Sequence, residues 1–543
     1  MKPLKYILLS CCVLAAGCDD FLVENPETSV SNTGVYNSLT SANAVLTGCY
    51  GLMQSQNCYS FNYLHVLSAS SGMGVSIKQN DVNLTSMNIL PSDVNVSNVY
   101  NGTYKTIMVA NDIIKGMDTS ILPASVEKNR IHGEAYFIRA LSYFNLVRLF
   151  GKVSLITEPV TSYENAHIAR TEVDVVYKQI LSDLQKAWEL MPEKADKEEG
   201  HPYKYAAKAL RAKVYLTLAG DDENSEYWQL CYNDALDVKE HGEYQLVRPY
   251  ANLFGSPNKN NAESIFEIQF SATASDGRMT ETTFPVGHEL MDKIPTQGKS
   301  WGKTRPNQIA FDQFDVNDPR REASFVYGKY ENIYEKGKDK NVWLYPSPES
   351  NADENSVFKK GDSEYAAWKK YYDPMMTARS TNANFVYMRY ADVLLMLAEA
   401  ANELPDHQSE AYGYLNLVLD RAADANGDGV RDNNTETVPE TVDESVSKEQ
   451  LRERIFRERL KEFTGECDEW YTVRRRGEAY LKMIMQEHND RIDEIFKNGK
   501  LREFVYKYNI TDDNVKKNML LPFPQDEITR NENISQEEQN FGY

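Results

Sequence analysis

The segment GEAYFIRALSYFNLVRLFG, residues 133–151, has the periodicity of a helix and is apolar on most of its sides. A helix that is apolar almost all round must be buried among other helices. The segment therefore predicts a mainly α-helical fold. Its strongest apolar face consists of Phe137, Ala140, Leu141, Phe144 and Val147.

Helical patterns recur in pairs on both sides of this segment. Four hairpins are predicted, joining residues 39–55 to 100–118, 133–151 to 172–190, 203–220 to 227–242, and 387–404 to 409–423. Ser41 is the predicted N-cap of the first helix, and Ala206, Ala209 and Ala212 would let two helix axes approach closely. Such hairpins are typical of tetratricopeptide-like stacks, which form a right-handed superhelical scaffold. A generic helical bundle would show the same periodicity.

The pattern changes between residues 244 and 384. The stretches EYQLVRPYANLFG (243–255) and ESIFEIQFSA (263–272) resemble strands, and Gly, Pro, Asn and Ser become frequent after Phe270. We expect a few short strands within a loop-rich region. Long irregular segments on a rigid scaffold are where binding sites commonly lie.

The amino terminus has the features of a secretory leader. Lys2 and Lys5 precede a short apolar run, and LAAGCDDFL (14–22) then resembles a bacterial lipoprotein box. This pattern predicts a signal peptide over residues 1–17 and lipidation of Cys18. An ordinary signal peptide with an incidental cysteine is the alternative.

Composition restricts the classes of ligand. The chain has 543 residues, of which 41% are hydrophobic and 11% aromatic, and its net charge is −21 at pH 7. So negative a surface argues against nucleic acid or anionic lipid headgroups as ligands. The 34 tyrosines and 6 tryptophans instead favour a neutral or polar ligand that packs on amphipathic rings.

Few cysteines remain after the leader. Cys49 and Cys58 are close enough in sequence to pair, although buried free thiols are the commoner outcome. No Cys-X-X-Cys and no metal-like Cys/His spacing occurs among the cysteines that follow Cys18.

No catalytic residue is predicted. The sequence has no GxSxG, HExxH, phosphate-binding loop or dinucleotide-binding fingerprint, and its eight histidines are scattered. A glycosidase needs only two carboxylates, so 80 acidic residues leave a surface hydrolase open as an alternative.

Two segments have the residue types of a sugar-binding site, which needs rings held rigidly beside hydrogen-bonding groups. The polar loop at residues 70–98 offers Lys78, Asn80 and Asp81. The irregular region offers Trp301, Arg305, Tyr327, Tyr330, Trp343 and Trp368. The alternative is structural, because a loop tryptophan can equally cover the core and an arginine can pair with an acid.

Other charged residues are expected to be structural. Arg139, Arg389 and Glu399 lie on apolar helices and should link adjacent hairpins. The run Arg474, Arg475 and Arg476 is expected to pair with acids of the RERLKEF helix, residues 457–463, rather than with phosphate.

The stretch DANGDGVRD, residues 424–432, resembles part of a calcium loop. Asp424, Asn426, Asp428 and Asp432 lie at odd positions, and Gly429 stands where such a loop turns sharply. Asn-Gly and Asp-Gly are also frequent turn formers. A structural calcium ion is therefore one interpretation and a plain turn is the other; no further cofactor is expected.

Seven segments carry a family resemblance when they are taken together and in order. The segments are FIRALSYFNLVRLFG (137–151), AAKALRAKVYLTLAG (206–220), ESIFEIQF (263–270), NDPRREASF (317–325), NFVYMRYADVLLMLAEAANE (384–403), IFRERLKEFTGECDEWYTVRRRG (455–477) and LLPFPQDEITRNENISQEEQNFGY (520–543). Together they resemble the SusD/RagB family of outer-membrane nutrient-binding lipoproteins of Bacteroidetes. The chain departs from the usual family pattern at Cys467, Asp468 and Glu469, and at Glu537 and Glu538.

This resemblance implies one compact domain after the leader. Residues 18–243 would form an N-terminal part with tetratricopeptide-like helices. Residues 244–543 would form a C-terminal part with the loop-rich ligand region and further helices. The family places its ligand contacts in loops of the two segments named above, but the contacting residues vary.

The resemblance also implies a function. Such proteins are anchored to the outer membrane at the cell surface, capture oligosaccharides or polysaccharides, and deliver them to a TonB-dependent SusC-like transporter. Asp19 and Asp20 resemble the surface-export signal that follows the lipidated cysteine in that phylum. A peptide-binding RagB-like protein is the main alternative, and a surface hydrolase or a pure scaffold are the others. The sequence does not identify the ligand.

Overall fold

The computed structural model confirms a mainly helical fold in which the four predicted hairpins are packed pairs. The pairs are α3 (Leu39–Met53) with α6 (Val94–Thr119), α7 (Val126–Phe150) with α8 (Val173–Leu190), α9 (Lys204–Ala219) with α10 (Tyr227–His241), and α14 (Tyr390–Glu403) with α15 (Gln408–Ala422). The structure describes residues 32–163, 166–194, 199–271, 297–298, 302–335, 338–345, 365–371, 373, 377–378, 381–432, 438–496 and 505–543.

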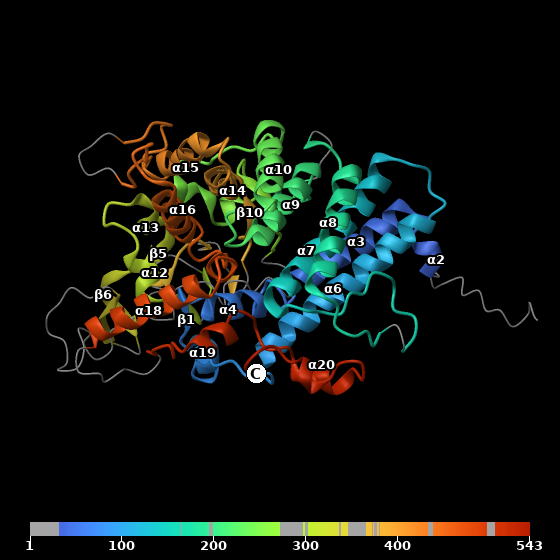
Figure 1. Ribbon diagram of the computed structural model, residues 1–543, viewed down its shortest axis with the longest axis horizontal. Helices are drawn as coiled ribbons and strands as arrows, with labels where there is room; N and C mark the ends of the chain where they lie inside the picture. The colour runs from blue at the N-terminus through green and yellow to red at the C-terminus, as the bar shows by residue number, and fades with distance from the viewer. Residues whose placement is uncertain are drawn as a thin grey trace, which may run out of the picture.

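The hairpins form a continuous stack because consecutive pairs also pack against each other. Helix α6 packs on α7, α8 packs on α9, and α10 packs on α14. Figure 1 shows the stack crossing the molecule from α3 and α6 to α14 and α15. Helix α14 joins the stack although about 150 residues separate it from α10, so the loop-rich region is a long insertion into the stack.

Side-chain caps fix the start of several stack helices. Asp93 accepts hydrogen bonds from the backbone of Asn95 and Val96 at 2.8 and 3.1 Å, so α6 begins earlier than the periodicity predicted. Ser38 caps α3 by accepting from the Ser41 amide at 3.4 Å. The predicted cap at Ser41 is therefore wrong by one turn, because Leu39 and Thr40 already belong to the helix.

Shorter helices and further C-terminal helices surround the stack. Among them, α4 was not predicted, because Asn62–Ala69 is buried throughout and has no amphipathic pattern. The described helices outside the stack are α2 (Asn32–Val35), α4 (Asn62–Ala69), α5 (Val82–Thr85), α12 (Gln308–Asp312), α13 (Pro319–Ser324), α16 (Lys448–Glu462), α17 (Glu469–Arg475), α18 (Glu478–Ile495), α19 (Asp512–Lys517) and α20 (Gln525–Arg530). The 3-10 turns are η2 (Gln79–Asp81), η4 (Tyr250–Leu253), η5 (Ser256–Asn258) and η7 (Gln536–Glu538).

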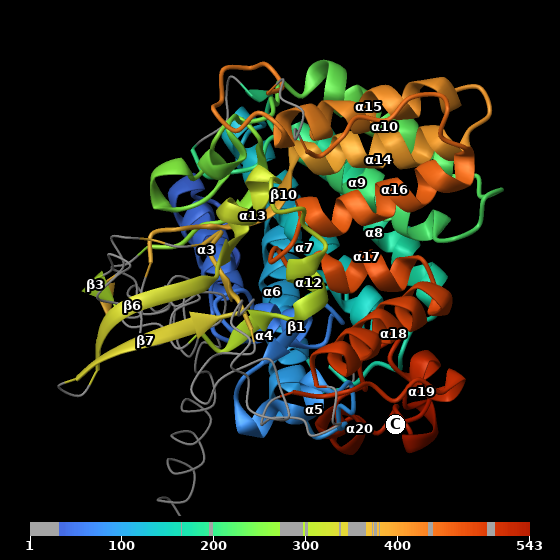
Figure 2. The ribbon, with the colours of Figure 1, turned by 90° about the vertical axis from the view of Figure 1, so that its left-hand side faces the viewer.

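The strands are short and pair two by two. Four pairs are antiparallel, and β3 pairs with β9 in parallel. The hairpin of β6 and β7 projects away from the helices (Figure 2). The pairs are β1 (Gly74–Ser76) with β4 (Thr304–Pro306), β2 (Ser264–Ile268) with β10 (Phe385–Arg389), β3 (Gln297–Gly298) with β9 (Thr377–Ala378), β5 (Phe325–Val326) with β8 (Ala367–Trp368), and β6 (Gly328–Glu335) with β7 (Lys338–Leu344).

One strand-like prediction is wrong. Residues 243–255 form no strand; they form loop and the 3-10 turn η4, which directly follows Pro249. Proline has no amide hydrogen to give to a ladder, so this stretch could not join a sheet as a regular strand. The prediction for residues 263–272 is confirmed in part, since β2 occupies Ser264–Ile268 and is fully buried.

Two hydrophobic cores hold the fold. The larger core runs through the hairpin stack and includes Phe137, Leu394 and Trp470. The smaller core lies beneath β1, β5 and β8 and against α18, and includes Phe311 and Trp368. Within the described ranges, none of the helices has the length and hydropathy that crossing a bilayer requires. Cys49 and Cys58 are buried free thiols and form no disulfide.

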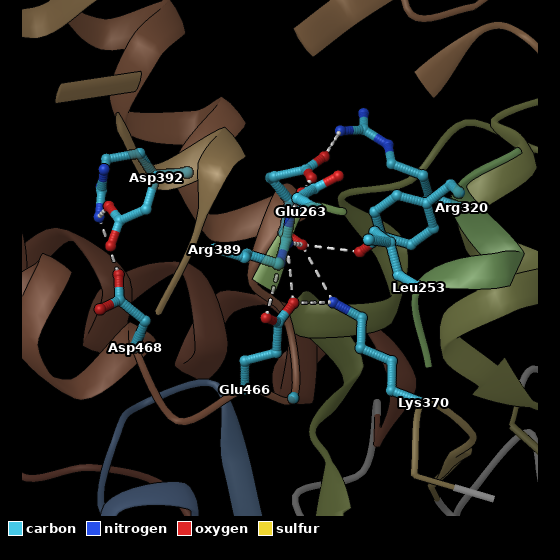
Figure 3. A network of polar contacts seen from close by, with 12 residues as sticks. Leu253, Glu263, Arg320, Lys370, Arg389, Asp392, Glu466 and Asp468 are labelled. Carbon is cyan, nitrogen blue, oxygen red and sulfur yellow. Dashed lines mark hydrogen bonds and ion pairs between the residues drawn. The ribbon is translucent and has the colours of Figure 1, made fainter. Parts of the chain in front are cut away.

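Arg139, Arg389 and Glu399 form buried ion pairs, as predicted, but none of these pairs joins two adjacent hairpins. Arg139 binds Asp183 of α8 through Nη2 to Oδ1 at 2.7 Å. Arg389, directly before α14, contacts Glu263 directly before β2, Glu462 at the end of α16 and Glu466 beyond it. Figure 3 shows Arg389 between Glu263 and Glu466. The structure thus uses charge, as well as apolar packing, to fix the loop-rich region on the stack.

The prediction for the arginine run is wrong. Arg475 and Arg476 bind Glu399 of α14 at 2.8 and 3.2 Å, and not the acids of the 457–463 helix. Arg474 has no carboxylate partner among the described residues and donates to backbone carbonyl oxygens instead. The acids of α16 are already engaged by arginines that are distant in sequence, including Arg320 and Arg421.

Candidate functional site

The two segments predicted to bind ligand meet in one short sheet. Strand β1, from the 70–98 loop, pairs antiparallel with β4, from the irregular region, so that Val75 is opposite Arg305. The pairing continues beyond the strands, since the Ile77 amide donates to the Lys303 carbonyl oxygen at 2.9 Å. We call the surface formed by Phe61, Lys78, Asn80 and Lys303 the β1–β4 shelf.

A buried acid and a buried histidine support the shelf from behind. His65 on α4 has no exposed surface, and its Nε2 lies 2.9 Å from Oδ2 of Asp81, which is 3% exposed. The Ser76 hydroxyl donates to the same carboxylate oxygen at 3.3 Å. This arrangement locks the turn η2 onto α4 and thereby fixes the position of Lys78 and Asn80.

The environment keeps Asp81 ionised. Burial alone would raise its pKa, but the hydrogen bond from His65 and the nearby charges of His65 and Lys78 lower the pKa below its ordinary value. His65 Nδ1 has no hydrogen-bond partner among the described residues, so the imidazole contacts the carboxylate through Nε2 alone. The pair therefore serves to hold the loop.

The outer side of the shelf carries donors next to a ring. The Lys78 side chain is 43% exposed, and its Nζ lies 3.6 Å from Asp81 Oδ1; Asn80 is also exposed. Phe61 stacks on His65 with 5.1 Å between ring centroids, and Lys303 Nζ lies 4.4 Å from the Phe61 centroid. Ammonium and amide groups at these places can donate hydrogen bonds to ligand hydroxyls or carbonyls.

Sequence reasoning found Lys78, Asn80 and Asp81 but missed Phe61, His65 and Lys303. Phe61 belongs to the aromatic stretch CYSFNY, residues 58–63, which precedes the predicted loop and was the available signal. His65 and Lys303 carry no pattern of their own. They become part of the site only because α4 and β4 are brought together.

Two predicted ligand residues are buried. Arg305 is 6% exposed on β4, and its Nε donates to the Gly302 carbonyl oxygen at 3.3 Å. Trp368 is 3% exposed and stacks on Phe325 with 5.7 Å between centroids. Trp368 also packs against Gly465, where an added Cβ would approach the indole to 2.8 Å. As placed, both side chains have packing positions and offer a ligand almost no surface.

The remaining predicted aromatics are spread over other places. Tyr327 is half-buried, with its ring near Phe311 and its hydroxyl donating to Glu322. Tyr330 and Trp343 lie on β6 and β7, opposite Val342 and Lys329, and their side chains are not among the described ones. Trp301 and Cys18 lie outside the described residues. Ligand contact by any of these aromatics stays a prediction.

A separate groove lies between α12, α16 and α18, and its volume is about 790 Å³. Its charged side chains pair with each other, as in Arg457 with Glu487 and Arg491 with Asp312. Among the described residues, no aromatic side chain lines this groove. It therefore fits a neutral sugar less well than the β1–β4 shelf does, since sugars pack on rings.

A sequence model of the SusD family matches residues 262–543, more than half of the chain. The chain belongs to the SusD family. A second family model, described as starch-binding associating with outer membrane, matches residues 20–216. Together the two matches cover most of the chain; residues 217–261, which include α10, lie in neither match.

Relatives with SusD-like names align over nearly the whole SusD-family chain. "SusD-like protein P2" of Formosa agariphila is 26% identical, over 98% of this chain and 99% of the relative. A "SusD-like protein" of Bacteroides ovatus is 25% identical, over 87% of this chain and 82% of the relative.

Solved structures share the fold. A SusD homolog from Bacteroides thetaiotaomicron has a TM-score of 0.73 at 22% identity, covering 95% of this chain and 99% of that one. A structure described as a SusD-like carbohydrate binding protein from Bacteroides fragilis has a TM-score of 0.71 at 19% identity, covering 92% and 99%. At these identities the comparison shows the fold, which is the one predicted from the helix hairpins.

The candidate calcium loop of this SusD-family chain is a series of side-chain-capped turns. Asp424 is 1% exposed; it accepts from the amides of Gly427 and Gly429 at 2.8 and 3.0 Å and binds Arg248 at 2.8 Å. Asn426 and Asp428 accept from amides two residues on, and Asp432 Oδ1 lies 3.4 Å from Asn426 Nδ2. Among the described residues, no group of three or more His, Cys, Asp or Glu side chains is placed to hold a metal ion. Calcium binding stays a prediction.

Proposed function

We propose that this SusD-family protein captures glycan at the cell surface and passes it to a TonB-dependent SusC-like transporter. Membership of the family supports the proposal, as does the matching model described as starch-binding associating with outer membrane. The Bacteroides fragilis protein of the same fold is described as carbohydrate binding. The mechanism is capture without catalysis.

The pairing of β1 with β4 is the observation that carries the proposal. It brings two segments that are about 230 residues apart into one surface and places Lys78 and Asn80 on a rigid support. Rigidly held donors lose little entropy when they bind a sugar hydroxyl. Trp301 lies two residues before the Lys303 position, so we expect its ring to supply the stacking surface beside the donors.

The electrostatics of the shelf favour binding over hydrolysis. A general acid of a glycosidase needs a carboxyl group whose pKa is raised so that it holds a proton near neutral pH. The Asp81 carboxyl has a lowered pKa and is covered by His65 and Ser76. It can orient the loop but has no proton to donate at neutral pH.

Ligand titration tests the proposal directly. The lipid-free chain, residues 19–543, is titrated by calorimetry against a panel of oligosaccharides and peptides, and each mixture is assayed for product after overnight incubation. We expect binding of a glycan without product. Appearance of product would replace the capture mechanism by hydrolysis, and binding of peptides alone would favour the RagB-like alternative.

Variants then locate the site. Lys78→Ala and Asn80→Ala each remove one donor of the shelf and should weaken binding about tenfold, the typical effect of a hydrogen bond to a neutral or charged group. Trp301→Ala should have an equal or larger effect through lost stacking. Lys152→Ala is the matched control, because the Lys152 side chain is 48% exposed and forms a surface ion pair with Glu172. Equal affinities in all four variants would place the ligand elsewhere.

Lipid anchoring at Cys18 is proposed from the leader pattern. Cys18→Ser should abolish labelling with a radioactive fatty acid and release the protein from the membrane fraction. Intact chains should copurify with a SusC-like barrel from detergent extracts of the outer membrane. Retention of the Cys18→Ser chain in the membrane would contradict the anchor.

A further inference from the structure

A cavity that is partly open to solvent lies where the hairpin stack meets the C-terminal helices. Its volume is about 240 Å³. Residues of α7, α8, α9, α16 and α17 and of the segment after α19 form its walls. The polar lining of the cavity is mainly cationic: Arg148, Lys213, Arg459, Arg474 and Arg475, with Asp468.

Two of these arginines are buried without a carboxylate partner among the described residues. Arg474 is 7% exposed and donates to the carbonyl oxygens of Asn518, Trp470 and Ser70. Arg148 is 9% exposed and donates to the Phe144 carbonyl oxygen, to Asn145 and to the Tyr387 hydroxyl. All these acceptors are uncharged.

Both guanidinium groups remain charged at neutral pH. Burial lowers the pKa of Arg474 to about 9, still well above 7. The rings of Phe144 and Tyr471 sandwich Arg148, each centroid 3.6 Å from its central carbon, which offsets part of the desolvation. A buried cation without a counter-ion is strongly unfavourable, so two of them beside one cavity call for negative charge inside it.

The other cations of the wall leave no spare carboxylate. Lys213 and Arg459 share Asp392 and Asp468, with Lys213 Nζ 2.8 and 2.7 Å from their oxygens. Arg475 and Arg476 share Glu399. Among the described residues, each acid that lines the cavity or pairs with one of these wall cations is thus shared by two cations and is not free to neutralise Arg148 or Arg474.

The wall also presents donors that have no acceptor. Arg459 is 2% exposed, and its Nε and Nη1 make no hydrogen bond, since only Nη2 reaches Asp392 and Asp468. Trp470 is 1% exposed, and its Nε1 also lacks a partner. Buried donors are rarely left unpaired in folded proteins. Both residues line the cavity, and these donor atoms have almost no accessible surface, so a small shift of the two side chains is needed for a ligand with several acceptor oxygens to satisfy them.

We propose that this cavity binds a small oxyanion: sulfate, phosphate or a carboxylate. Water molecules can accept from Arg459 and Trp470, but they bring no charge to balance Arg148 and Arg474. An oxyanion supplies both acceptors and charge, and charge-assisted hydrogen bonds are the strong ones. The site is independent of glycan capture at the shelf. It sits between the stack and α17, so an occupying anion ties the two parts together.

Thermal unfolding of the lipid-free chain tests the site. Sodium sulfate, phosphate and acetate are each titrated against sodium chloride at constant ionic strength. An anion that binds only the folded state raises the melting temperature with the logarithm of its concentration above its dissociation constant. We expect such a rise for at least one of the three anions, and the one with the lowest half-effect concentration identifies the source. Identical curves for all three anions and for chloride would overturn the proposal.

A matched pair of tryptophan variants separates the site from a general salt effect. Trp470→Phe keeps a ring but removes the unpaired donor, and it should raise the half-effect concentration about tenfold or more. Trp228→Phe is the control, because Trp228 is 1% exposed but its Nε1 donates to the Asp222 carbonyl oxygen at 2.8 Å, away from the cavity. The Trp228→Phe variant should have a lower melting temperature, but this temperature should respond to anions as it does in the parent. Equal anion responses in the two variants would contradict the site.

Charge removal and direct observation complete the test. Arg474→Gln should lose most of the anion response, and circular dichroism at low temperature shows whether the variant is folded. If it does not fold, crystals of the unmodified chain soaked in selenate decide the matter through anomalous scattering. A selenium peak within hydrogen-bond distance of Arg459 and Trp470 supports the proposal, whereas ordered water alone in the cavity overturns it.

Discussion

Two groups of buried arginines in this molecule differ in how their charge is balanced. Around Arg389 (Figure 3), Arg320 contacts Glu462, and Arg421 contacts both Glu263 and Glu462. Each of these cations has at least one carboxylate partner. In the cavity beside α17, Arg148 and Arg474 have none among the described residues. The same residue type is thus structural in one place and calls for a ligand in the other.

The pKa of the neighbouring acids reflects this difference. Burial alone would raise the pKa of Glu462, but Arg421, Arg389 and Arg320 together hold it well below its ordinary range. Glu469, at the start of α17, has no ion pair among the described residues, and burial raises its pKa to about 7. Balanced and unbalanced charges therefore lie within one short stretch, residues 462–469.

Removing the central cation of the balanced group should have the largest effect on stability. In Arg389→Met, the carboxylates of Glu263, Glu462 and Glu466 lose their shared partner inside the core. Breaking a buried pair from one side typically costs about 3–5 kcal/mol. Urea unfolding at pH 7 measures the change. Arg491→Met is the control, because its ion pairs are partly exposed and worth less than about 1 kcal/mol. Similar losses in both variants would show that burial does not distinguish the two groups.

The isolated carboxyl of Glu469 should make stability depend on pH in the opposite direction from the paired acids. Its pKa is about 7 in the folded protein and about 4.3 when unfolded, so the folded state holds the extra proton between these values. Unfolding free energy then falls as pH rises from about 4.5 to about 7 and levels off above. The total effect is about 3–4 kcal/mol at most.

Glu469→Gln removes this dependence while keeping the acceptor for the Gly465 amide, which donates to Glu469 Oε1 at 2.5 Å. We expect the variant and the parent to unfold alike at pH 5, and the variant to be more stable at pH 8. Denaturant unfolding across this range measures the difference. Glu478→Gln, an exposed acid on the next helix, should not change the profile. If the difference in unfolding free energy between the parent and Glu469→Gln were the same at pH 5 and at pH 8, this result would contradict the raised pKa.

The sequence predicted the stack far better than the site. Helix periodicity is local, so α8, α9 and α14 could be placed within a few residues. The fully buried α4 has no periodicity to detect, and the pairing of β1 with β4 joins segments about 230 residues apart. Composition alone also cannot tell a packed tryptophan such as Trp368 from an exposed one.

Charge partners were predicted only where the pattern was simple. Arg139, Arg389 and Glu399 stand on apolar helices, so burial and pairing followed from their position. In the run at residues 474–476, Arg475 and Arg476 both reach Glu399, whereas Arg474 donates to backbone carbonyl oxygens. A sequence shows that charges are adjacent along the chain, but the partners are set by packing.

Asp81 is intermediate between the paired acids around Arg389 and the unpaired Glu469, because its partners are an imidazole and a partly exposed lysine. Asp81→Asn keeps the shape but loses the charge, and we expect a loss of about 1–2 kcal/mol at pH 7. The lowered pKa means that this contribution is present above about pH 4 and disappears as the carboxyl is protonated at lower pH. Unfolding at pH 7 and pH 3 checks the sign. A larger loss at pH 3 than at pH 7 would contradict it.

The smallest effect is expected at the loop of residues 424–432, where acids are balanced by turn amides. Asp424 is held by Arg248 and two amides, so a calcium ion would depend on Asp428 and Asp432, which lie at the surface. Surface loops with so few carboxylates bind calcium in the range of about 0.1–1 mM. At tenfold excess over such a dissociation constant, the stabilisation is about 1.4 kcal/mol. We expect a small rise in melting temperature between 0.1 and 10 mM calcium that disappears in Asp432→Asn. The same rise with magnesium, or in the variant, would assign this loop to a turn held by its own amides and would leave calcium without a role here.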